Sequence, residues 1–213
     1  MICVSIAGKN PQECIKALEG VEFAEIRMET ISGIDEAGVR QIFSSKAKLI
    51  ATCRPGKMDE AERKMLLLAA IASGAAYVDV EVDAADPYKQ DMVAAAKKKG
   101  CQVIVSFHDY ERTPPREELV QIVNWCFESG ADVAKIACKA NSKRDAARLL
   151  GLLDGERKVV AVGIGPEGRI TRLVAPLLGS PFTYASEGKG KETAEGQMAK
   201  GEMEKIIREM SDA

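Results

Sequence analysis

The chain has 213 residues, of which 46% are hydrophobic and 29% are charged, and its formal net charge is −2. This composition is typical of a globular protein and excludes a disordered chain, and so small a net charge gives no field that would attract nucleic acid or an anionic membrane. The length suits one sizeable core, so we expect a single domain over residues 1–213.

Short apolar runs alternate with amphipathic stretches along the whole chain, which predicts a parallel α/β protein. The predicted strands span residues 2–7, 23–28, 47–54, 77–82, 103–110, 132–139, 158–164 and 182–185. The predicted helices span residues 11–18, 35–43, 59–73, 87–99, 114–127, 142–153, 170–178 and 194–210. In the third helix, one apolar face is predicted for Met65, Leu66, Leu68, Ala69 and Ala72.

Eight strand–helix units predict a closed (β/α)8 TIM barrel without a second domain. An open doubly wound sheet is the alternative, but no GxGxxG motif follows the first strand.

The six cysteines form no CxxC pair, which indicates reduced thiols in a cytoplasmic protein. No apolar stretch is long enough to span a bilayer, and the chain opens directly with a strand-like run.

Polar residues gather at or just after the ends of the predicted strands, where sites form in such a barrel. They are Glu25, Arg27, Glu29, Arg54, Asp79, Glu81, His108, Lys135, Arg169, Arg172, Ser186, Thr193 and Gln197. Two explanations stay open, namely a layer of ion pairs or a functional site. One histidine does not make a zinc site, and a Mg²⁺ site from Glu25, Asp79 and Glu81 would compete with neighbouring cations that already balance those charges.

Lys135 and His108 carry the chemistry that this pattern predicts. Lys135 lies inside an apolar run, although lysine is rarely buried unless it is paired, and His108, the one histidine, ends the preceding run. A desolvated lysine loses its proton more readily, and its free amine forms a Schiff base with a carbonyl. A nearby histidine can then move the proton of the adjacent C–H, and arginines can bind a carboxylate or a phosphate.

With these residues in place, the sequence resembles the type I 3-dehydroquinate dehydratase family. The resemblance covers essentially the full chain. The marks of the resemblance are Cys3-Val4-Ser5-Ile6, Glu25-Ile26-Arg27, Ala51-Thr52-Cys53-Arg54, Val78-Asp79-Val80-Glu81, Ser106-Phe107-His108-Asp109, Ala134-Lys135-Ile136, Gly168-Arg169-Ile170-Thr171-Arg172 and Thr193-Ala194-Glu195-Gly196-Gln197. The His, Lys, Arg and Gln marks, in this order on eight strand–helix units, are highly specific.

The resemblance implies a shikimate-pathway enzyme that removes water from 3-dehydroquinate with syn geometry to give 3-dehydroshikimate, without a cofactor or a metal. It implies that Lys135 forms the imine, that His108 takes the C2 proton and protonates the departing C1 hydroxyl, and that Asp79 orients His108. It also implies substrate contacts from Glu25, Arg27, Arg54, Arg172, Thr193 and Gln197, in a pocket lined by Val162 and Tyr184.

Some positions depart from the family pattern. Thr193 and Thr171 stand where that pattern often has serine, and Glu29 stands where it often has aspartate. Met58 occupies the position of a family glutamate, with Glu60 nearby, so support of His108 by a second carboxylate stays open. The glycine-rich loop at 187–193 is expected to be a mobile lid, with a solvated linker as the alternative.

Two other functions stay open from the residues alone. One is a class I aldolase acting on a sugar phosphate, which the loop after the seventh strand could bind. The other is a non-catalytic barrel that binds a small acid, which would leave Lys135 without a use. Arg172, Thr193 and Gln197 favour a carboxylate substrate over a phosphate.

We expect a small-molecule substrate and no nucleic-acid or membrane partner. The apolar residues Trp125 and Phe127 would suit a homodimer.

Overall fold

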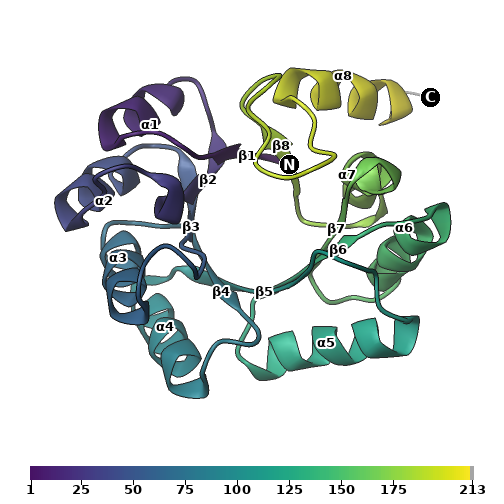
Figure 1. The fold of residues 1–213 in the computed structure, drawn as a ribbon, viewed down its shortest axis with the longest axis horizontal. Coiled ribbons are helices and arrows are strands. Elements are labelled where there is room, and N and C mark those ends of the chain that lie inside the picture. Colours follow the sequence, from purple (N-terminus) through teal and green to yellow (C-terminus); the bar gives the residue numbers. More distant parts are fainter. Residues whose placement is uncertain (212–213) are drawn as a thin grey trace. The chain divides into compact units, whose positions relative to one another are not determined.

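The computed structural model describes residues 1–211, in which eight strands alternate with eight helices (Figure 1). The strands are β1 (Ile2–Ile6), β2 (Phe23–Arg27), β3 (Lys48–Thr52), β4 (Tyr77–Glu81), β5 (Gln102–Asp109), β6 (Val133–Lys139), β7 (Val159–Ile164) and β8 (Thr183–Ser186). The helices are α1 (Pro11–Ala17), α2 (Glu36–Phe43), α3 (Glu60–Ala72), α4 (Asp86–Lys99), α5 (Arg116–Glu128), α6 (Lys143–Leu150), α7 (Arg169–Val174) and α8 (Lys200–Ser211). Short 3-10 turns are η1 (Met28–Thr30), η2 (Gly151–Leu153), η3 (Pro166–Gly168) and η4 (Ala175–Leu178).

The strands form one sheet in the order β7-β6-β5-β4-β3-β2-β1-β8, which is the strand order of a (β/α)8 barrel. The pairs β1–β2, β2–β3, β3–β4 and β6–β7 are all parallel. Parallel strands covered on both faces become continuous apolar runs, and all six residues of β7 are buried. The fold class predicted from the alternating pattern is confirmed.

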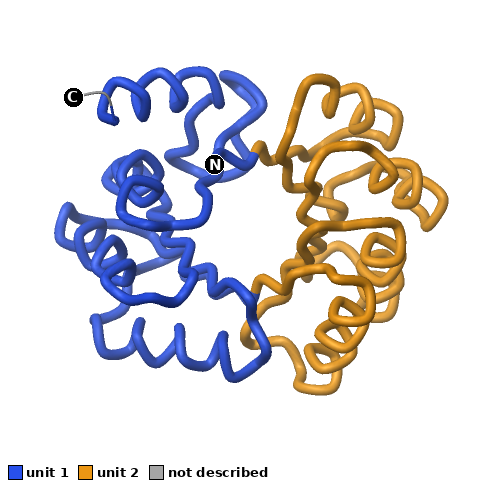
Figure 2. Tube along the Cα trace, turned by 180° about the vertical axis from the view of Figure 1, so that it is seen from behind, with its two compact units in different colours: residues 1–3, 105–213 blue, residues 4–104 orange. Residues whose placement is uncertain are grey.

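Two compact units make up the chain (Figure 2). Residues 4–104 form the first, called here the N-terminal unit, and residues 1–3 and 105–213 form the second, called here the C-terminal unit. The boundary cuts through β1 and β5, so no linker marks it. That residues 1–213 act as a single domain stays a prediction.

Several helices begin at a side chain that caps their first turn. Asn10 and Glu13 form a reciprocal capping box at α1, and Asp35, Asp59 and Ser142 each accept a hydrogen bond from a backbone N–H three residues on. A cap of this kind stabilises a helix by about 1 kcal/mol, because it satisfies an N–H that has no partner within the helix. These local signals explain why most predicted helix starts lie within two residues of the observed ones.

The last helix begins later than the sequence pattern predicts. The sequence pattern predicts a helix over residues 194–210, but α8 begins only at Lys200. Gly196 has φ +79°, and a Cβ there would lie 2.4 Å from the carbonyl oxygen of Gly165. Residues 193–197 are therefore held as an irregular segment by contacts far away in the sequence. A cluster of Ala185, Met198 and Met203 then packs the start of α8 against β8.

The buried face of α3 also differs from the one that the sequence pattern predicts. Leu66, Leu67, Ala70 and Ile71 are the residues of α3 that are buried. Most of the predicted face instead lines an external groove of about 540 Å³ in the N-terminal unit. The lining residues are Glu36, Arg40, Ala61, Lys64, Met65, Leu68, Ala69, Ala72 and Ser73. A helix with apolar residues almost all round, as here, does not reveal its core face by periodicity alone.

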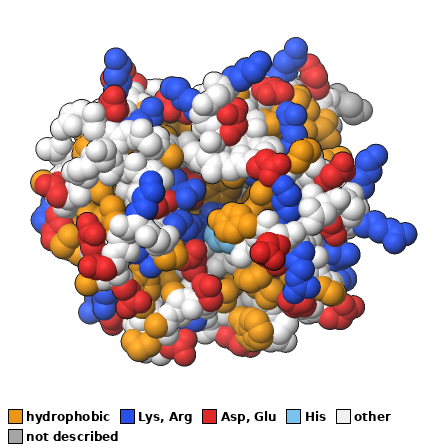
Figure 3. Space-filling view, viewed as in Figure 1, with side chains coloured by type: hydrophobic (Ala, Val, Ile, Leu, Met, Phe, Trp, Pro, Cys, Tyr) orange, Lys and Arg blue, Asp and Glu red, His pale blue; other side chains and the backbone are white. Residues whose placement is uncertain are grey.

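Within residues 1–211, no helix is long and apolar enough to cross a membrane. Acidic and basic side chains are interspersed on the face drawn in Figure 3.

Candidate active site

Lys135 extends from the middle of β6, opposite Val160 of β7. It is only 6% exposed, and its Nζ atom lies 4.4 Å from the centroid of the Tyr184 ring on β8. The face of an aromatic ring attracts an ammonium group and so fixes the position of this amine. A side chain carried by a strand in this way is held more rigidly than one on a loop.

Arg172 of α7 is a buried cation in the same C-terminal unit. It is 1% exposed, and its Nη1 atom donates a long hydrogen bond of 3.4 Å to the carbonyl oxygen of Tyr184. Within residues 1–211, its Nε and Nη2 atoms are buried and make no hydrogen bond. Burial lowers the pKa of Arg172 to about 10, so the guanidinium is still charged at neutral pH. A buried charge of this kind is costly unless an anion joins it.

Arg172 owes its position to a tight turn between β7 and α7. The backbones of Gly163 and Gly168 touch, since a Cβ on Gly163 would lie 2.6 Å from the Cα of Gly168. The hydroxyl of Thr171 accepts a hydrogen bond of 2.7 Å from the Gly163 N–H and donates one of 2.8 Å to the Gly168 carbonyl. Thr171 thereby ties the start of α7 to the end of β7, one residue before Arg172.

Replacing Thr171 by valine is expected to lower the free energy of unfolding by about 1–3 kcal/mol, because the buried Gly163 N–H then loses its partner. Urea unfolding would measure the loss. Thr171→Ser keeps the hydroxyl and is the matched control, with an expected loss below about 1.5 kcal/mol. Equal stability of wild type and Thr171→Val would show that the bridge through Thr171 does not hold the turn.

Thr193 and Gln197 are joined to each other in the segment before α8. The Gln197 Oε1 atom accepts hydrogen bonds from the Thr193 N–H at 2.7 Å and from the Thr193 hydroxyl at 3.1 Å. Gln197 is buried and Thr193 is half-buried. The sequence places these two residues in one mark, and the structure brings their side chains into contact. Ser186, in contrast, is fully buried, and its hydroxyl donates a hydrogen bond of 3.0 Å to the Gly188 carbonyl in the loop that follows β8.

His108 is the next-to-last residue of β5 and is half-buried. Its ring stacks on that of Tyr110, with centroids 6.0 Å apart and planes 14° from parallel. Asp109 ends the strand by accepting hydrogen bonds of 2.9 Å from the N–H groups of Glu111 and Arg112. The contact of His108 with Tyr110, a residue that is 68% exposed, was not predicted from the sequence.

In the N-terminal unit, Glu25 of β2 is a buried carboxylate. It is 3% exposed, and its carboxylate accepts hydrogen bonds from Ser5 at 2.9 Å and from Thr52 at 3.1 Å. The strand register explains both contacts, because Glu25 pairs with Ser5 of β1 and lies two residues from the partner of Thr52. The two hydroxyls hold the carboxylate in one orientation.

Arg54 follows β3 and forms an ion-pair cluster with β4. It contacts Asp79 at 2.8 Å and Glu81 at 3.5 Å. Burial opposes the charge on Arg54, but these carboxylates outweigh it and raise its pKa. Burial also raises the pKa of Glu81, against the lowering effect of Arg54. The ion-pair layer considered from the sequence is therefore present here, and Arg54 already balances the carboxylates that a Mg²⁺ ion would need.

Arg27 forms a second ion pair, at 2.6 Å to Glu29. Its side chain keeps 24% exposure, and although burial works against its charge, Glu25 and Glu29 raise its pKa. Glu29 thus pairs with an arginine, as the aspartate that it replaces could. Arg169 does not join Arg172, because it is exposed and lies 3.7 Å from Glu202 of α8.

Arg63 of α3 is a residue that sequence reasoning missed. It donates a hydrogen bond of 3.0 Å to the Cys53 carbonyl, lies 3.8 Å from Glu81 and sits over the Tyr88 ring at 5.7 Å. It therefore supports the chain just before Arg54. Its helical position between polar neighbours gave no signal in the sequence. Glu60 is exposed at the start of α3, and its support of His108 stays a prediction.

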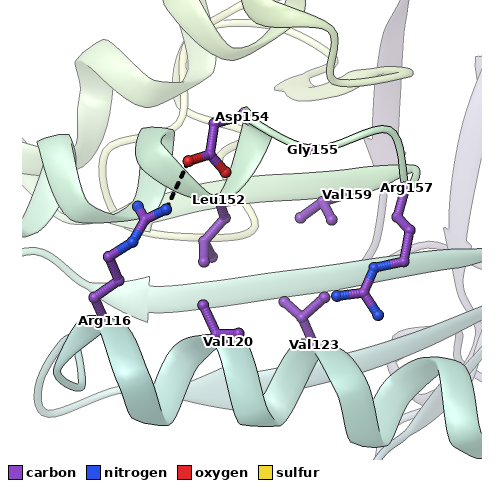
Figure 4. A pocket seen from close by; sticks show the side chains of 8 residues that line it. All are labelled: Arg116, Val120, Val123, Leu152, Asp154, Gly155, Arg157 and Val159. Atoms are coloured by element: carbon purple, nitrogen blue, oxygen red, sulfur yellow. Dashed lines mark hydrogen bonds and ion pairs between the residues drawn. The ribbon is translucent and has the colours of Figure 1, made fainter.

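A pocket of about 230 Å³ in the C-terminal unit lies apart from these residues (Figure 4). It is lined by Arg116, Val120, Val123, Leu152, Asp154, Gly155, Arg157 and Val159. Arg116 and Arg157 lie at opposite ends of it, and Arg116 pairs with Asp154 at 2.6 Å. None of the candidate catalytic residues lines this pocket, so it is not their substrate site.

Comparison with known proteins identifies relatives along the entire chain. The family model for "Type I 3-dehydroquinase" matches residues 2–213. The 3-dehydroquinate dehydratase of Methanocaldococcus jannaschii is 31% identical over 99% of this chain and 99% of its own length. That of Methanothermobacter thermautotrophicus is 34% identical over 98% of this chain and 96% of its own. The crystal structure of 3-dehydroquinate dehydratase from Geobacillus kaustophilus covers 99% of this chain and 91% of its own, with a TM-score of 0.88 at 23% identity.

Proposed function

The chain belongs to the type I 3-dehydroquinase family, whose enzymes are hydro-lyases of the shikimate pathway, and we propose that it dehydrates 3-dehydroquinate through a Schiff base on Lys135. The observation that carries the mechanism is the position of Lys135, buried within a strand against the face of Tyr184. Lysine is rarely buried without a partner, and here the Tyr184 ring lies against the amine that imine formation would use.

In the first step, the free amine of Lys135 attacks the substrate ketone and water leaves, so that a C=N bond replaces C=O. The protonated imine withdraws electrons from the adjacent carbon, which makes the C2 proton acidic. His108 takes that proton, and the electron pair forms an enamine. The enamine expels the C1 hydroxyl, which leaves as water with the proton returned by His108. Hydrolysis of the product imine restores Lys135 and releases 3-dehydroshikimate.

His108 suits the proton-transfer role because histidine changes its charge close to neutral pH. Its place at the end of β5 leaves it half-buried, so that a substrate can reach it, while the Tyr110 ring limits how it can turn. In this proposal Asp79 is a positioning residue that orients His108 and is itself fixed by Arg54.

Arg172 is the proposed partner of the substrate carboxylate, because it is a buried cation with two unsatisfied N–H-bearing atoms in the described chain. Two parallel hydrogen bonds from a guanidinium match the geometry of a carboxylate. Thr193 and Gln197 add hydrogen bonds to the same group, and Glu25, Arg27 and Arg54 bind the ring hydroxyls. Val162 and Tyr184, both buried, form apolar walls.

Borohydride reduction tests this proposal. The protein with 3-dehydroquinate should lose activity irreversibly on addition of borohydride, and mass spectrometry should locate the reduced adduct on the peptide that contains Lys135. Borohydride without substrate is the control and should leave activity intact. Full activity after treatment with both reagents would rule out an imine intermediate. Family membership favours this dehydration over the class I aldolase and the acid-binding barrel.

We also propose a cytoplasmic enzyme, since its substrate and product are small acids of a biosynthetic pathway. A homodimer is proposed on the basis of exposed apolar residues such as Trp125, which is 50% exposed on α5. Light scattering combined with size-exclusion chromatography would measure the assembly.

A further inference from the structure

Lys139 and Glu195 form an ion pair that the proposed mechanism does not use. Lys139 is the last residue of β6, four positions after Lys135, and its Nζ atom lies 2.5 Å from Glu195 Oε2. Its side chain is 23% exposed and that of Glu195 is 57% exposed. The partners are 56 residues apart in the chain, so their contact joins a barrel strand to the irregular segment at 193–197.

Two further contacts join the same segment to the turn after β7. The Gly165 N–H donates a hydrogen bond of 3.0 Å to the Glu195 carbonyl. Gly196 packs on the backbone of Gly165 so closely that a Cβ would lie 2.4 Å from its carbonyl oxygen. The Lys139 side chain also lies against Gly165, since a Cβ on Gly165 would lie 2.9 Å from the Lys139 Nζ atom. Gly165 is therefore the surface on which both Lys139 and residues 195–196 rest.

The base of the loop is fixed separately. The Ser186 N–H donates to the Met198 carbonyl at 2.8 Å, and Ser186 and Ala199 form an isolated parallel bridge. Within the part of the chain that the structure describes, residues 187–197 thus have a fixed base and a further attachment at Lys139, Glu195 and the two glycines. Thr193 and Gln197 flank that attachment. The contacts that hold Glu195 therefore also determine where the side chains of Thr193 and Gln197 lie.

We propose that Lys139 is a positioning residue, whose ion pair with Glu195 docks the segment 193–197 on Gly165 and so fixes Thr193 and Gln197 for substrate binding. The inference rests on the proposed function, in which those two residues bind the substrate carboxylate. Lys139 keeps its backbone position because its carbonyl accepts a hydrogen bond of 2.8 Å from the buried Thr113. The anchor is thus part of strand β6, whereas the docked segment lies outside the regular elements.

The test compares Lys139→Met and Glu195→Gln with Lys191→Met, all in the full chain. Lys191 pairs with Glu187 at 3.1 Å inside the same loop, so its replacement changes the net charge as Lys139→Met does without touching the attachment. Steady-state kinetics with 3-dehydroquinate should show a rise in KM of about threefold for Lys139→Met and Glu195→Gln, with kcat nearly unchanged, because partly exposed ion pairs contribute little. Lys191→Met should behave as wild type.

The double variant Lys139→Met/Glu195→Gln should raise KM no more than either single variant does, since each already removes the whole pair. In wild type, 1 M salt should screen the pair and raise KM toward that of the variants, whose KM should change less. Gly196→Ala should also raise KM although it alters no charge, because its methyl group would displace the segment from Gly165. That variant separates docking of the segment from a direct charge effect on the substrate.

Hydrogen exchange of the substrate-free protein tests docking independently of catalysis. Amides of residues 190–197 should exchange about threefold faster in Lys139→Met than in wild type, whereas those at the loop base should not change. If the proposed function is wrong, dehydration is absent in wild type as well, and the exchange difference still reports on the attachment. Unchanged exchange would overturn the docking role. Faster exchange with an unchanged KM would overturn the positioning role, and a loss of kcat alone would place Lys139 in the chemistry instead.

Discussion

Lys135→Ala is expected to abolish both the borohydride-trapped adduct and turnover of 3-dehydroquinate. No other group in the proposed mechanism can form the imine, so the loss should resemble removal of a catalytic nucleophile, about 10⁴- to 10⁶-fold in kcat. Mass spectrometry of the reduced protein and a product assay at high enzyme concentration would measure the two effects. The variant also removes a buried amine beside Tyr184, so thermal unfolding should show a fold at least as stable as wild type.

Lys143→Ala is the matched control for this variant. Lys143 is exposed at the first position of α6, outside the strand, and its loss should leave both adduct and turnover at the wild-type level. Lys139→Met should also keep the adduct at saturating substrate, since it is expected to alter KM. A substrate-dependent adduct that persists in Lys135→Ala would show that the nucleophile is another lysine.

The positions of Lys135 and His108 in the fold could be predicted because they depend on local pattern. A run of apolar residues predicts a buried strand wherever it occurs, and β6 is buried at six of its seven residues. The alternation of strands and helices then orders these strands as neighbours. Burial of Lys135 follows from its place in the run and required no knowledge of tertiary contacts.

Arg172 and the segment at 193–197 show what local pattern does not contain. The burial of Arg172 depends on the close packing of Gly163 on Gly168, and the irregular course of residues 193–197 depends on Gly165. Such contacts join residues from different elements, and no spacing of apolar residues encodes them. For Arg172 only the resemblance to a family led us to predict a role. Nothing in the sequence predicted the ion pair between Lys139 and Glu195, because its partners lie 56 residues apart and a charged residue has the same sequence neighbours whether or not it has a distant partner.

His108→Ala is expected to retain imine formation while kcat falls by about 10²- to 10⁴-fold, which is the usual contribution of general acid–base catalysis. The amine of Lys135 can still attack the ketone, but the C2 proton has no acceptor. Since the imine then accumulates before the elimination, borohydride should trap a reduced adduct that still carries the C1 hydroxyl of the substrate. His108→Gln keeps a polar side chain without a group that titrates near neutral pH, so it should show the same loss.

The mass of the trapped adduct decides which step His108 serves. An adduct lighter by one water would mean that elimination proceeds without His108, and that the slow step is hydrolysis of the product imine. An absent adduct would mean that His108 is needed for the attack of Lys135 itself. Turnover near the wild-type rate would remove His108 from the mechanism altogether. Only the adduct that retains the C1 hydroxyl, together with slow turnover, assigns the C2 proton to His108, because it places the block after the imine forms and before the C1 hydroxyl leaves.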